Sequence, residues 1–168
     1  MAVSRAGQSV AAKTIQFPDS SAWDRTGFLL WHAVLEWHRK VTDGLAKLDM
    51  THAQFVLLAS AVWLAHHGEV PSQVELASHA GVDPMMTSQV VRLLERQKFV
   101  RRVPDKDDAR VRRIEVTVLG RRKVSSAVKI VEKIDLQVFG GIDNSESFRK
   151  ALRQVADRTA NGARRNRQ

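Results

Sequence analysis

The sequence predicts a mainly α-helical protein with one small β-hairpin, arranged as a winged helix-turn-helix with additional helices on either side. Three observations predict this class. Apolar residues recur at helical spacing over most of the chain. Two short helical segments are joined by only three residues, Ala80-Gly81-Val82, as in a helix-turn-helix. A segment with strand-like alternation and a charged turn then follows the second of these helices.

Charge in this sequence is concentrated in two segments. The chain has 168 residues and a formal net charge of +9. Residues 92–133 contain fourteen Lys or Arg against six Asp or Glu, residues 149–168 contain seven against one, and the rest of the chain therefore carries −5. Positive charge confined in this way predicts a binding face for an anionic partner. Double-stranded DNA is the favoured partner, and a membrane surface is the less favoured alternative.

Composition also excludes several classes. The chain has no cysteine, which excludes disulfides and thiolate metal sites. Its longest apolar run, residues 55–65, is too short to span a bilayer, and residues 1–21 lack the apolar core of a signal peptide. We therefore expect a soluble protein of the cytoplasm, associated with the nucleoid, whose residues 1–21 form a flexible N-terminal arm.

The predicted elements begin with a long helix over residues 22–48, where apolar residues recur every three or four positions. The next helix begins at Thr51, which forms a capping box with Gln54, and it ends near His66, before Gly68. We expect residues 22–162 to form a single domain, with the winged helix-turn-helix at residues 50–118.

Two shorter helices make up the rest of the helix-turn-helix. Ser72 and Glu75 repeat the capping-box pattern, and Gly81 predicts the end of the first. Asp83 is a favourable N-cap and Pro84 suits the first helical position, where its missing N–H costs nothing. The second helix is therefore expected from residue 84 to about residue 99.

A hairpin and two helices complete the prediction. Residues 100–103 and 111–118 read as strands, with Ile114, Val116 and Val118 on the buried side, and residues 104–110 form the loop. A long helix over residues 117–139 ends at Gly140-Gly141, and a last helix ends near Asn161-Gly162. Residues 163–168 are expected to form a disordered basic tail.

The helix that starts at Pro84 has the composition of a recognition helix. Met86, Val90, Leu93 and Leu94 form its expected core-facing stripe. The opposite face carries hydroxyl, amide and guanidinium groups, which bond base edges and phosphates in a major groove. The alternative interpretation is an ordinary solvated helix face. We predict that the DNA-contacting residues are Ser72, Met85, Thr87, Ser88, Gln89, Arg92, Arg96, Asp108, Arg110 and Arg112.

The hairpin would then serve as the wing. An arginine at its tip, Arg110, can enter the minor groove beside the recognition helix, while the stem arginines Arg112 and Arg113 hold phosphates. Asp108 is expected to form an ion pair with Arg110 and to fix its direction. The alternative is a charged turn that only keeps the hairpin soluble.

Residues 76–120 resemble the MarR family of winged-helix transcriptional regulators. The family's wing reads roughly D-x-R-D-x-R-x-x-x-V-x-L-T-x-x-G. The matching positions here are Asp105, Asp108, Arg110, Ile114, Val116, Thr117 and Gly120. Asp107 departs from the usual Arg, and Lys98 stands where the family often has Gly, so Lys98 must adopt a left-handed conformation or the recognition helix must end differently. Residues 48–63 resemble the family more weakly.

This resemblance implies a sequence-specific transcriptional regulator that acts as a homodimer on a pseudo-palindromic operator, most often as a repressor. Helices over residues 22–48 and 117–161 would interlock the two chains. The apolar stripes of these helices agree, because a monomer would leave them exposed. The resemblance also implies a cleft for a small aromatic or phenolic effector, for which Trp31, His38 and Trp63 are candidates; the alternative is that these three residues only pack in the core or the interface.

Other functions have less support in the sequence. The histidine pairs lack the spacing and the neighbouring carboxylate of a helical metal site, so we expect no metal and no cofactor. There is no glycine-rich phosphate loop, nucleophile elbow or apolar carboxylate pair, so we expect no enzyme. The main alternative is an architectural winged-helix protein that binds any duplex, using its basic C-terminal segment.

Overall fold

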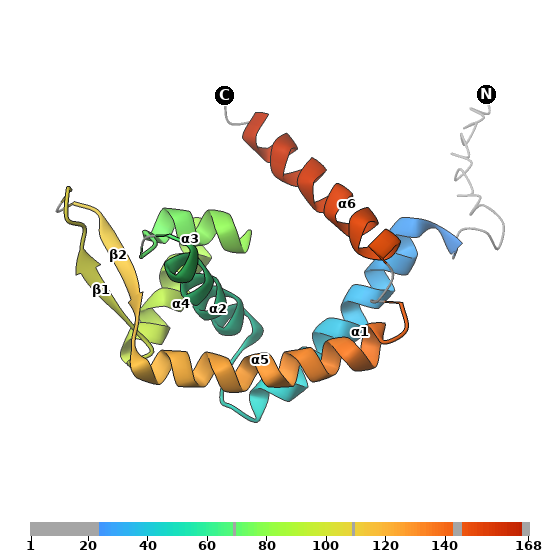
Figure 1. The fold of residues 1–168 in the computed structure, drawn as a ribbon, viewed down its shortest axis with the longest axis horizontal. Coiled ribbons are helices and arrows are strands. Elements are labelled where there is room, and N and C mark those ends of the chain that lie inside the picture. The colour runs from blue at the N-terminus through green and yellow to red at the C-terminus, as the bar shows by residue number, and fades with distance from the viewer. Residues whose placement is uncertain (1–23, 69, 109, 143–145, 166–168) are drawn as a thin grey trace, which may run out of the picture. The chain divides into compact units, whose positions relative to one another are not determined.

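The computed structural model describes residues 24–68, 70–108, 110–142 and 146–165. Over these residues the chain forms mainly helices and one hairpin, which confirms the predicted fold class (Figure 1). It divides into two compact units, Met1–Leu35 and Glu36–Gln168. The predicted N-terminal arm, residues 1–21, lies outside the described residues.

The flanking helices differ in their bounds from the sequence prediction. Helix α1 covers Thr26–Ala46, inside the predicted residues 22–48. Helix α6 covers Glu146–Arg165 and continues past Asn161-Gly162, so the predicted disorder is wrong for residues 163–165. A glycine lowers helix stability by about 1 kcal/mol, which does not end a helix whose neighbours favour it. Residues 166–168 lie outside the described part of the chain.

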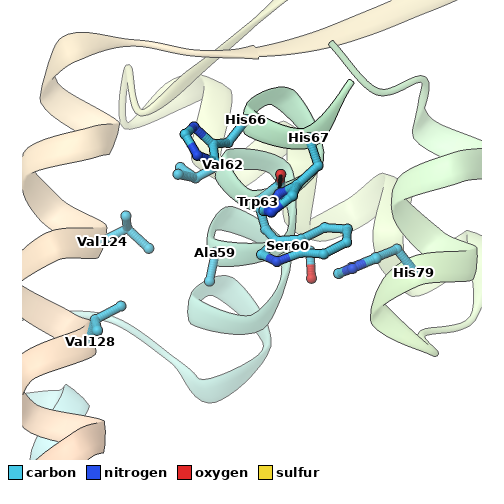
Figure 2. Close-up of a pocket in the computed structure, with 9 residues that line it drawn as sticks. All are labelled: Ala59, Ser60, Val62, Trp63, His66, His67, His79, Val124 and Val128. Atoms are coloured by element: carbon cyan, nitrogen blue, oxygen red, sulfur yellow. Dashed lines mark hydrogen bonds between the residues drawn. The ribbon is translucent and has the colours of Figure 1, made fainter. Parts of the chain in front are cut away.

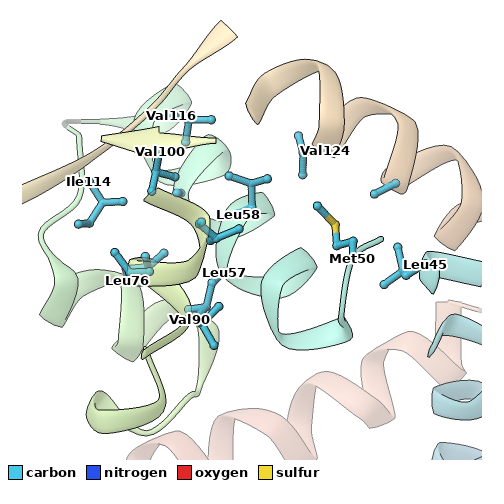
Figure 3. Packing of buried hydrophobic residues seen from close by; sticks show 14 of the residues in the cluster. Leu45, Met50, Leu57, Leu58, Leu76, Val90, Val100, Ile114, Val116 and Val124 are labelled. Atoms are coloured by element: carbon cyan, nitrogen blue, oxygen red, sulfur yellow. The ribbon is translucent and has the colours of Figure 1, made fainter. Parts of the chain in front are cut away.

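Helix α2, His52–His67, packs against the next two helices, the second strand of the hairpin and the long helix that follows that strand. Its predicted capping box is present, since the Thr51 hydroxyl accepts from the Gln54 N–H and the Gln54 side chain accepts from the Thr51 N–H. Leu57 and Leu58 are fully buried. Figure 3 shows them among side chains from the neighbouring elements: Leu76, Val90, Val100, Ile114 and Val116.

The turn between α3, Gln73–Ala80, and α4, Pro84–Arg96, depends on one glycine. Gly81 has φ 64°, which is a left-handed backbone conformation. Glycine adopts this conformation at little steric cost because it has no Cβ. This turn lets the Val82 N–H donate to the Ala77 carbonyl at 3.1 Å. Asp83 then caps α4 by accepting from the N–H groups of Met85 and Met86, and Pro84 follows at the first helical position. The predicted helix-turn-helix is confirmed.

Helix α4 ends at Arg96, with Gln97 as its C-cap, because Lys98 takes φ 62°. The first of the two expected alternatives is therefore confirmed: a lysine adopts the left-handed conformation that the family often assigns to glycine. The turn allows the Phe99 N–H to donate to the Leu94 carbonyl at 2.9 Å. The chain then enters the hairpin directly.

The hairpin pairs β1, Val100–Pro104, with β2, Arg112–Val116, in antiparallel register. Ile114 and Val116 face the core as predicted. Val118 does not, because the strand ends two residues earlier and Val118 is exposed in the next helix. The Thr117 hydroxyl accepts from the Gly120 N–H at 3.0 Å and donates to the Lys98 carbonyl at 2.7 Å. Thr117 is therefore the N-cap of the helix that begins at Val118. The strand, with its alternation of buried and exposed residues, ends before this cap.

Helix α5, Val118–Phe139, buries one stripe made of Gly120, Val124, Ala127, Val131 and Ile134. This spacing places them on one face, which packs against α2. Trp37, in the part of α1 that belongs to the second unit, donates from Nε1 to Asp135 at 2.6 Å. None of the helices in the described part of the chain is long and apolar enough to cross a membrane.

Candidate nucleic-acid interface

The exposed face of α4 carries most of the predicted DNA-contacting residues. Met85, Gln89, Arg92 and Arg96 are exposed and lie three or four residues apart, so they share one side of the helix. Ser88 is half-buried beside them. Among the described residues, neither Arg92 nor Arg96 forms an ion pair. Two uncompensated guanidinium groups therefore lie on the face that the sequence predicted.

Thr87 does not belong to this face, and its predicted contact with DNA is wrong for this structure. Its side chain is fully buried, and its hydroxyl donates to the Asp83 carbonyl at 2.9 Å. The core-facing stripe consists of Thr87, Val90, Val91 and Leu94, whereas Met86 and Leu93 are exposed. Positions 87, 90, 91 and 94 have ideal helical spacing. Polarity misled the prediction, because a threonine can be buried once its hydroxyl bonds a backbone carbonyl.

Ser72, another predicted contact, lies half-buried at the start of α3. Its hydroxyl accepts from the Glu75 N–H at 3.2 Å, and its own N–H donates to the Glu75 carboxylate at 2.7 Å. The serine also faces Arg113 across an isolated β-bridge. Its main role in the structure is to hold the amino end of α3 against the wing.

Arg113 connects the wing to the rest of the domain. Its guanidinium donates to the Asp105 carboxylate, to Glu75 at 3.1 Å and to the Val70 carbonyl at 3.0 Å. In addition, the Ile114 N–H donates to the Pro71 carbonyl at 2.7 Å. The prediction that Arg113 holds phosphates is therefore wrong, because protein acceptors already occupy its donors. Instead, Arg113 fixes the orientation of β2 relative to α3.

The turn of the wing is organised by two aspartates. Asp105 accepts from the N–H groups of Asp107 and Asp108, at 2.8 and 3.1 Å. The hydrogen bond from Arg113, followed by these two backbone bonds, lowers the pKa of Asp105 to about 2. Asp108 accepts from the backbone N–H of Arg110 at 2.9 Å. Within the described residues Asp108 makes no ion pair with the Arg110 guanidinium, so that predicted pair is absent and Asp108 shapes the turn through the backbone.

Arg110 and Arg112 are exposed, and the described part of the chain offers neither an ion-pair partner. Their neighbours on the stem differ, since Arg101 pairs with Glu115 at 2.9 Å and Arg102 with Glu95 at 3.5 Å. The sequence prediction also passed over Lys106, which is exposed in the turn. Its position between two aspartates, in Asp105-Lys106-Asp107, concealed it as a candidate.

A cavity of about 450 Å³ lies between α2, α3 and α5 (Figure 2). Its walls are almost entirely apolar, and Trp63 is half exposed within it. The indole of Trp63 stacks on the rings of His67 and His79, with centroids 4.1 and 4.7 Å apart. The lining residues are Ala59, Ser60, Val62, Trp63, His66, His67, His79, Val124 and Val128.

Of the three residues predicted to line an effector cleft, only Trp63 lines this cavity. His38 instead packs edge-on against His52, with centroids 4.9 Å apart. Burial lowers the pKa of His52, and His38 lowers it further. Trp31 belongs to the N-terminal unit. The histidines His66, His67 and His79 were not predicted here. His79 belongs to α3 and meets Trp63 only after folding, whereas His67 lies four residues after Trp63 on α2 and its helical spacing could have indicated it. Among the described residues no group of three or more His, Asp or Glu is arranged to hold a metal.

Comparison with known proteins agrees with this arrangement. A sequence model of the MarR family matches residues 50–111. The uncharacterized HTH-type transcriptional regulator YdcH of Bacillus subtilis (strain 168) is 43% identical over 129 residues, which cover 77% of this chain and 88% of that protein.

Solved structures show the same fold. CouR from Rhodococcus jostii RHA1, bound to p-coumaroyl-CoA, superposes with a TM-score of 0.71 at 26% identity, over 82% of this chain and 92% of that one. BldR from Sulfolobus solfataricus has a TM-score of 0.71 at 20% identity, over 84% and 99% of the two chains. With its helix-turn-helix, its wing and these relatives, the chain belongs to the MarR family of DNA-binding transcriptional regulators.

Proposed function

We propose that this protein binds a specific pseudo-palindromic operator as a homodimer, represses transcription there, and leaves the DNA when a small aromatic effector binds. The observation that carries the proposal is the placement of four exposed arginines that have no ion-pair partner in the part of the chain that the structure describes. Arg92 and Arg96 lie on α4, and Arg110 and Arg112 lie at the wing. A recognition helix and a wing that present free cations together can contact one major groove and the adjacent minor groove.

The rigid attachment of the wing supports sequence-specific binding. Because Arg113 ties β2 to α3, the position of Arg110 relative to α4 is set before DNA is met. A preorganised surface loses less conformational entropy on binding, so more of the contact energy appears as affinity. An architectural protein that binds any duplex gains less from such a fixed geometry.

Exposed apolar side chains support the homodimer. In the first unit, Leu29, Trp31 and Val34 of α1 are exposed. In the second unit, Leu136 of α5 and Val155 of α6 are exposed as well. Helices with this much apolar surface are expected to bury it against another chain. Two-fold symmetry then presents two recognition helices to two half-sites about one turn of DNA apart.

The cavity beside Trp63 supports an aromatic effector. Its volume of about 450 Å³ and its apolar lining suit a ring, and the indole of Trp63 offers a surface for stacking. The relative CouR is bound to p-coumaroyl-CoA, which contains an aromatic acyl group. The cavity contacts both α3 of the helix-turn-helix and α5, so a ligand there can change the position of α3 relative to α5.

The decisive experiment is the selection of bound duplexes from a random DNA pool at about 150 mM salt, followed by sequencing. Recovery of an inverted repeat, preferred over random duplex by about 10³ or more, is the expected result. Binding without a motif, with an equally steep salt dependence for every duplex, would replace the proposal with the architectural function.

Two further measurements test the finer parts. Light scattering after gel filtration should give about 38 kDa for a dimer of 18.9 kDa chains.

Titration with aromatic carboxylic acids should release the selected duplex from the wild type. In Trp63→Ala the same titration should need a higher concentration, while affinity for the duplex without effector stays unchanged. Equal release of both proteins would remove the cavity from the mechanism.

A further inference from the structure

The amino-terminal half of α4 has an unusual surface for a segment that meets DNA. Residues 84–91, Pro-Met-Met-Thr-Ser-Gln-Val-Val, carry no charge, and the first arginine follows only at position 92. In helix-turn-helix proteins, the amino-terminal residues of the recognition helix contact base edges. The side chains available for that contact here are therefore uncharged: the exposed Met85 and Gln89, with the half-buried Ser88 hydroxyl beside them.

The cap of α4 makes this end poorly suited to phosphate. The Asp83 carboxylate accepts from the N–H groups of Met85 and Met86, at 2.8 and 3.2 Å. Those donors are the ones that a phosphate would use at a free helix end. The negative charge of Asp83 also repels the DNA backbone. Residues at this end are consequently better placed to contact bases.

Met85 is the more exposed of the two methionines at this end. The residue is 73% exposed and Met86 is 50% exposed, although burying a methionine is favourable by about 1.5–3 kcal/mol. It lies one turn before Gln89 on the same side of the helix, whereas Met86 lies one turn before the buried Val90. The outer face of α4 therefore pairs an apolar side chain with an amide.

This pair matches the chemistry of A·T pairs. In the major groove, thymine presents a 5-methyl group that apolar side chains contact, and adenine presents N6 and N7, which a glutamine bonds with two hydrogen bonds. Guanine is most often read by arginine or lysine, and neither occurs in residues 84–91. The positively charged side chains of this face, Arg92 and Arg96, lie about one and two turns after Gln89.

We propose that Met85 reads the methyl group of a thymine and that, with Gln89, it selects neighbouring A·T pairs in each half-site. This inference rests on the sequence-specific function proposed above and adds the base identity to it. It assigns a specificity-determining role to a methionine whose exposure the fold itself does not require.

The test removes a single methyl group from the DNA. In the inverted repeat recovered by selection, each thymine of the half-site is replaced in turn by deoxyuridine, which keeps every hydrogen-bonding group. For the wild type, affinity should fall about fourfold at the contacted thymine, the effect of leaving one methyl group unburied. Met85→Ala should bind the thymine and deoxyuridine duplexes equally.

Two control variants define the result. Met85→Leu keeps an apolar side chain and should remain sensitive to deoxyuridine. Met86→Ala, a change at the neighbouring methionine that is 50% exposed, should behave as the wild type. Because Met85 and Met86 are both exposed, neither substitution is expected to impair folding.

The outcomes separate this inference from the function on which it rests. A recovered motif with no deoxyuridine effect at any position would overturn the role of Met85 and leave the regulator intact. Full deoxyuridine sensitivity in Met85→Ala would assign the methyl contact elsewhere and also overturn it. Failure of the selection to yield any motif would overturn both proposals.

Discussion

Arg113 in β2 donates a hydrogen bond to Asp105 on the other side of the hairpin. Asp105 directly follows β1 and begins the turn. The same guanidinium reaches Glu75 in α3 at 3.1 Å. Asp105 in turn accepts two backbone N–H groups of the turn. One carboxylate therefore links the backbone of the wing turn to Arg113, which in turn contacts α3.

Acid should weaken this link. The pKa of Asp105 falls from 3.8 to about 2 on folding, so the carboxylate stabilises the fold fully above about pH 5, and the contribution is lost as pH falls through about 2. Asp105→Asn should be less stable than the wild type near neutral pH, and the difference should shrink towards about pH 2. Urea unfolding at several pH values measures it. In an Arg113→Met background the effect of Asp105→Asn should be smaller, and an equal effect there would show that Arg113 is not the cause.

Arg110→Ala should weaken binding of the selected duplex by about tenfold or more, because a charge-assisted contact is lost. The mass of the dimer and the melting temperature should not change, since Arg110 is exposed and the described residues give its side chain no ion pair. Fluorescence anisotropy measures the affinity. Arg101→Ala is the matched control, because it removes the same charge from a stem arginine that Glu115 already neutralises. Equal losses in both variants would mean that only net charge matters.

Gln89→Ala and Arg92→Ala should relax base preference at particular operator positions by about 1–3 kcal/mol, if these side chains bond base edges. Repeating the duplex selection with each variant measures this. Thr87→Ser is the control on the same helix: Thr87 is buried, so the recovered motif should stay the same. A uniform loss of affinity over all sequences would instead assign Gln89 and Arg92 to phosphates.

Gly120→Ala should destabilise the junction between the wing and α5. A Cβ at Gly120 would lie 2.1 Å from the Phe99 carbonyl oxygen, a backbone atom that must move. Overpacking of this kind costs about 1–3 kcal/mol. Gly27→Ala is the control, since its Cβ would have no described atom within 4 Å and an alanine favours a helix. Thermal unfolding of both variants gives the comparison, and equal melting temperatures would contradict the close approach at Gly120.

Lys98→Gly should raise the free energy of unfolding by up to about 1 kcal/mol. Lys98 has φ 62°, and a left-handed residue with a Cβ costs about 1–2 kcal/mol, part of which the greater unfolded-state freedom of glycine offsets. Lys98→Ala keeps the Cβ and should bring no such gain. Urea unfolding compares the three proteins, and a gain in Lys98→Ala as well would point to the charge of Lys98.

Local chemistry explains why much of the fold could be predicted. The capping boxes at Thr51 and Ser72, the Asp83 cap and the left-handed Gly81 involve residues within four positions of one another. Their effects do not depend on distant parts of the chain. The helix-turn-helix could therefore be inferred without any long-range contact, and the family was indicated by a motif resemblance within residues 76–120.

One error arose because a partner distant in sequence decided the role of the residue, and two arose from contacts within four residues. Arg113 resembled a phosphate ligand until Asp105 and Glu75 were seen to occupy its donors. Thr87 resembled a DNA contact until its hydroxyl was found bonded to Asp83 within the core. Asp108 was expected to hold the Arg110 side chain but accepts its backbone N–H. In each case the residue type was compatible with the predicted contact and with the contact that the structure shows.

The sequence by itself determined the winged helix-turn-helix, through short-range periodicity and caps, and the segments in which positive charge is concentrated. The regulator family was indicated by the resemblance of residues 76–120. Only the tertiary structure decided which cations remain free for DNA and which stabilise the wing. It also brought His79 of α3 to Trp63 of α2 at one cavity. The physical reason is that a side chain's role depends on what it contacts, and contacts between distant segments exist only after the chain has folded.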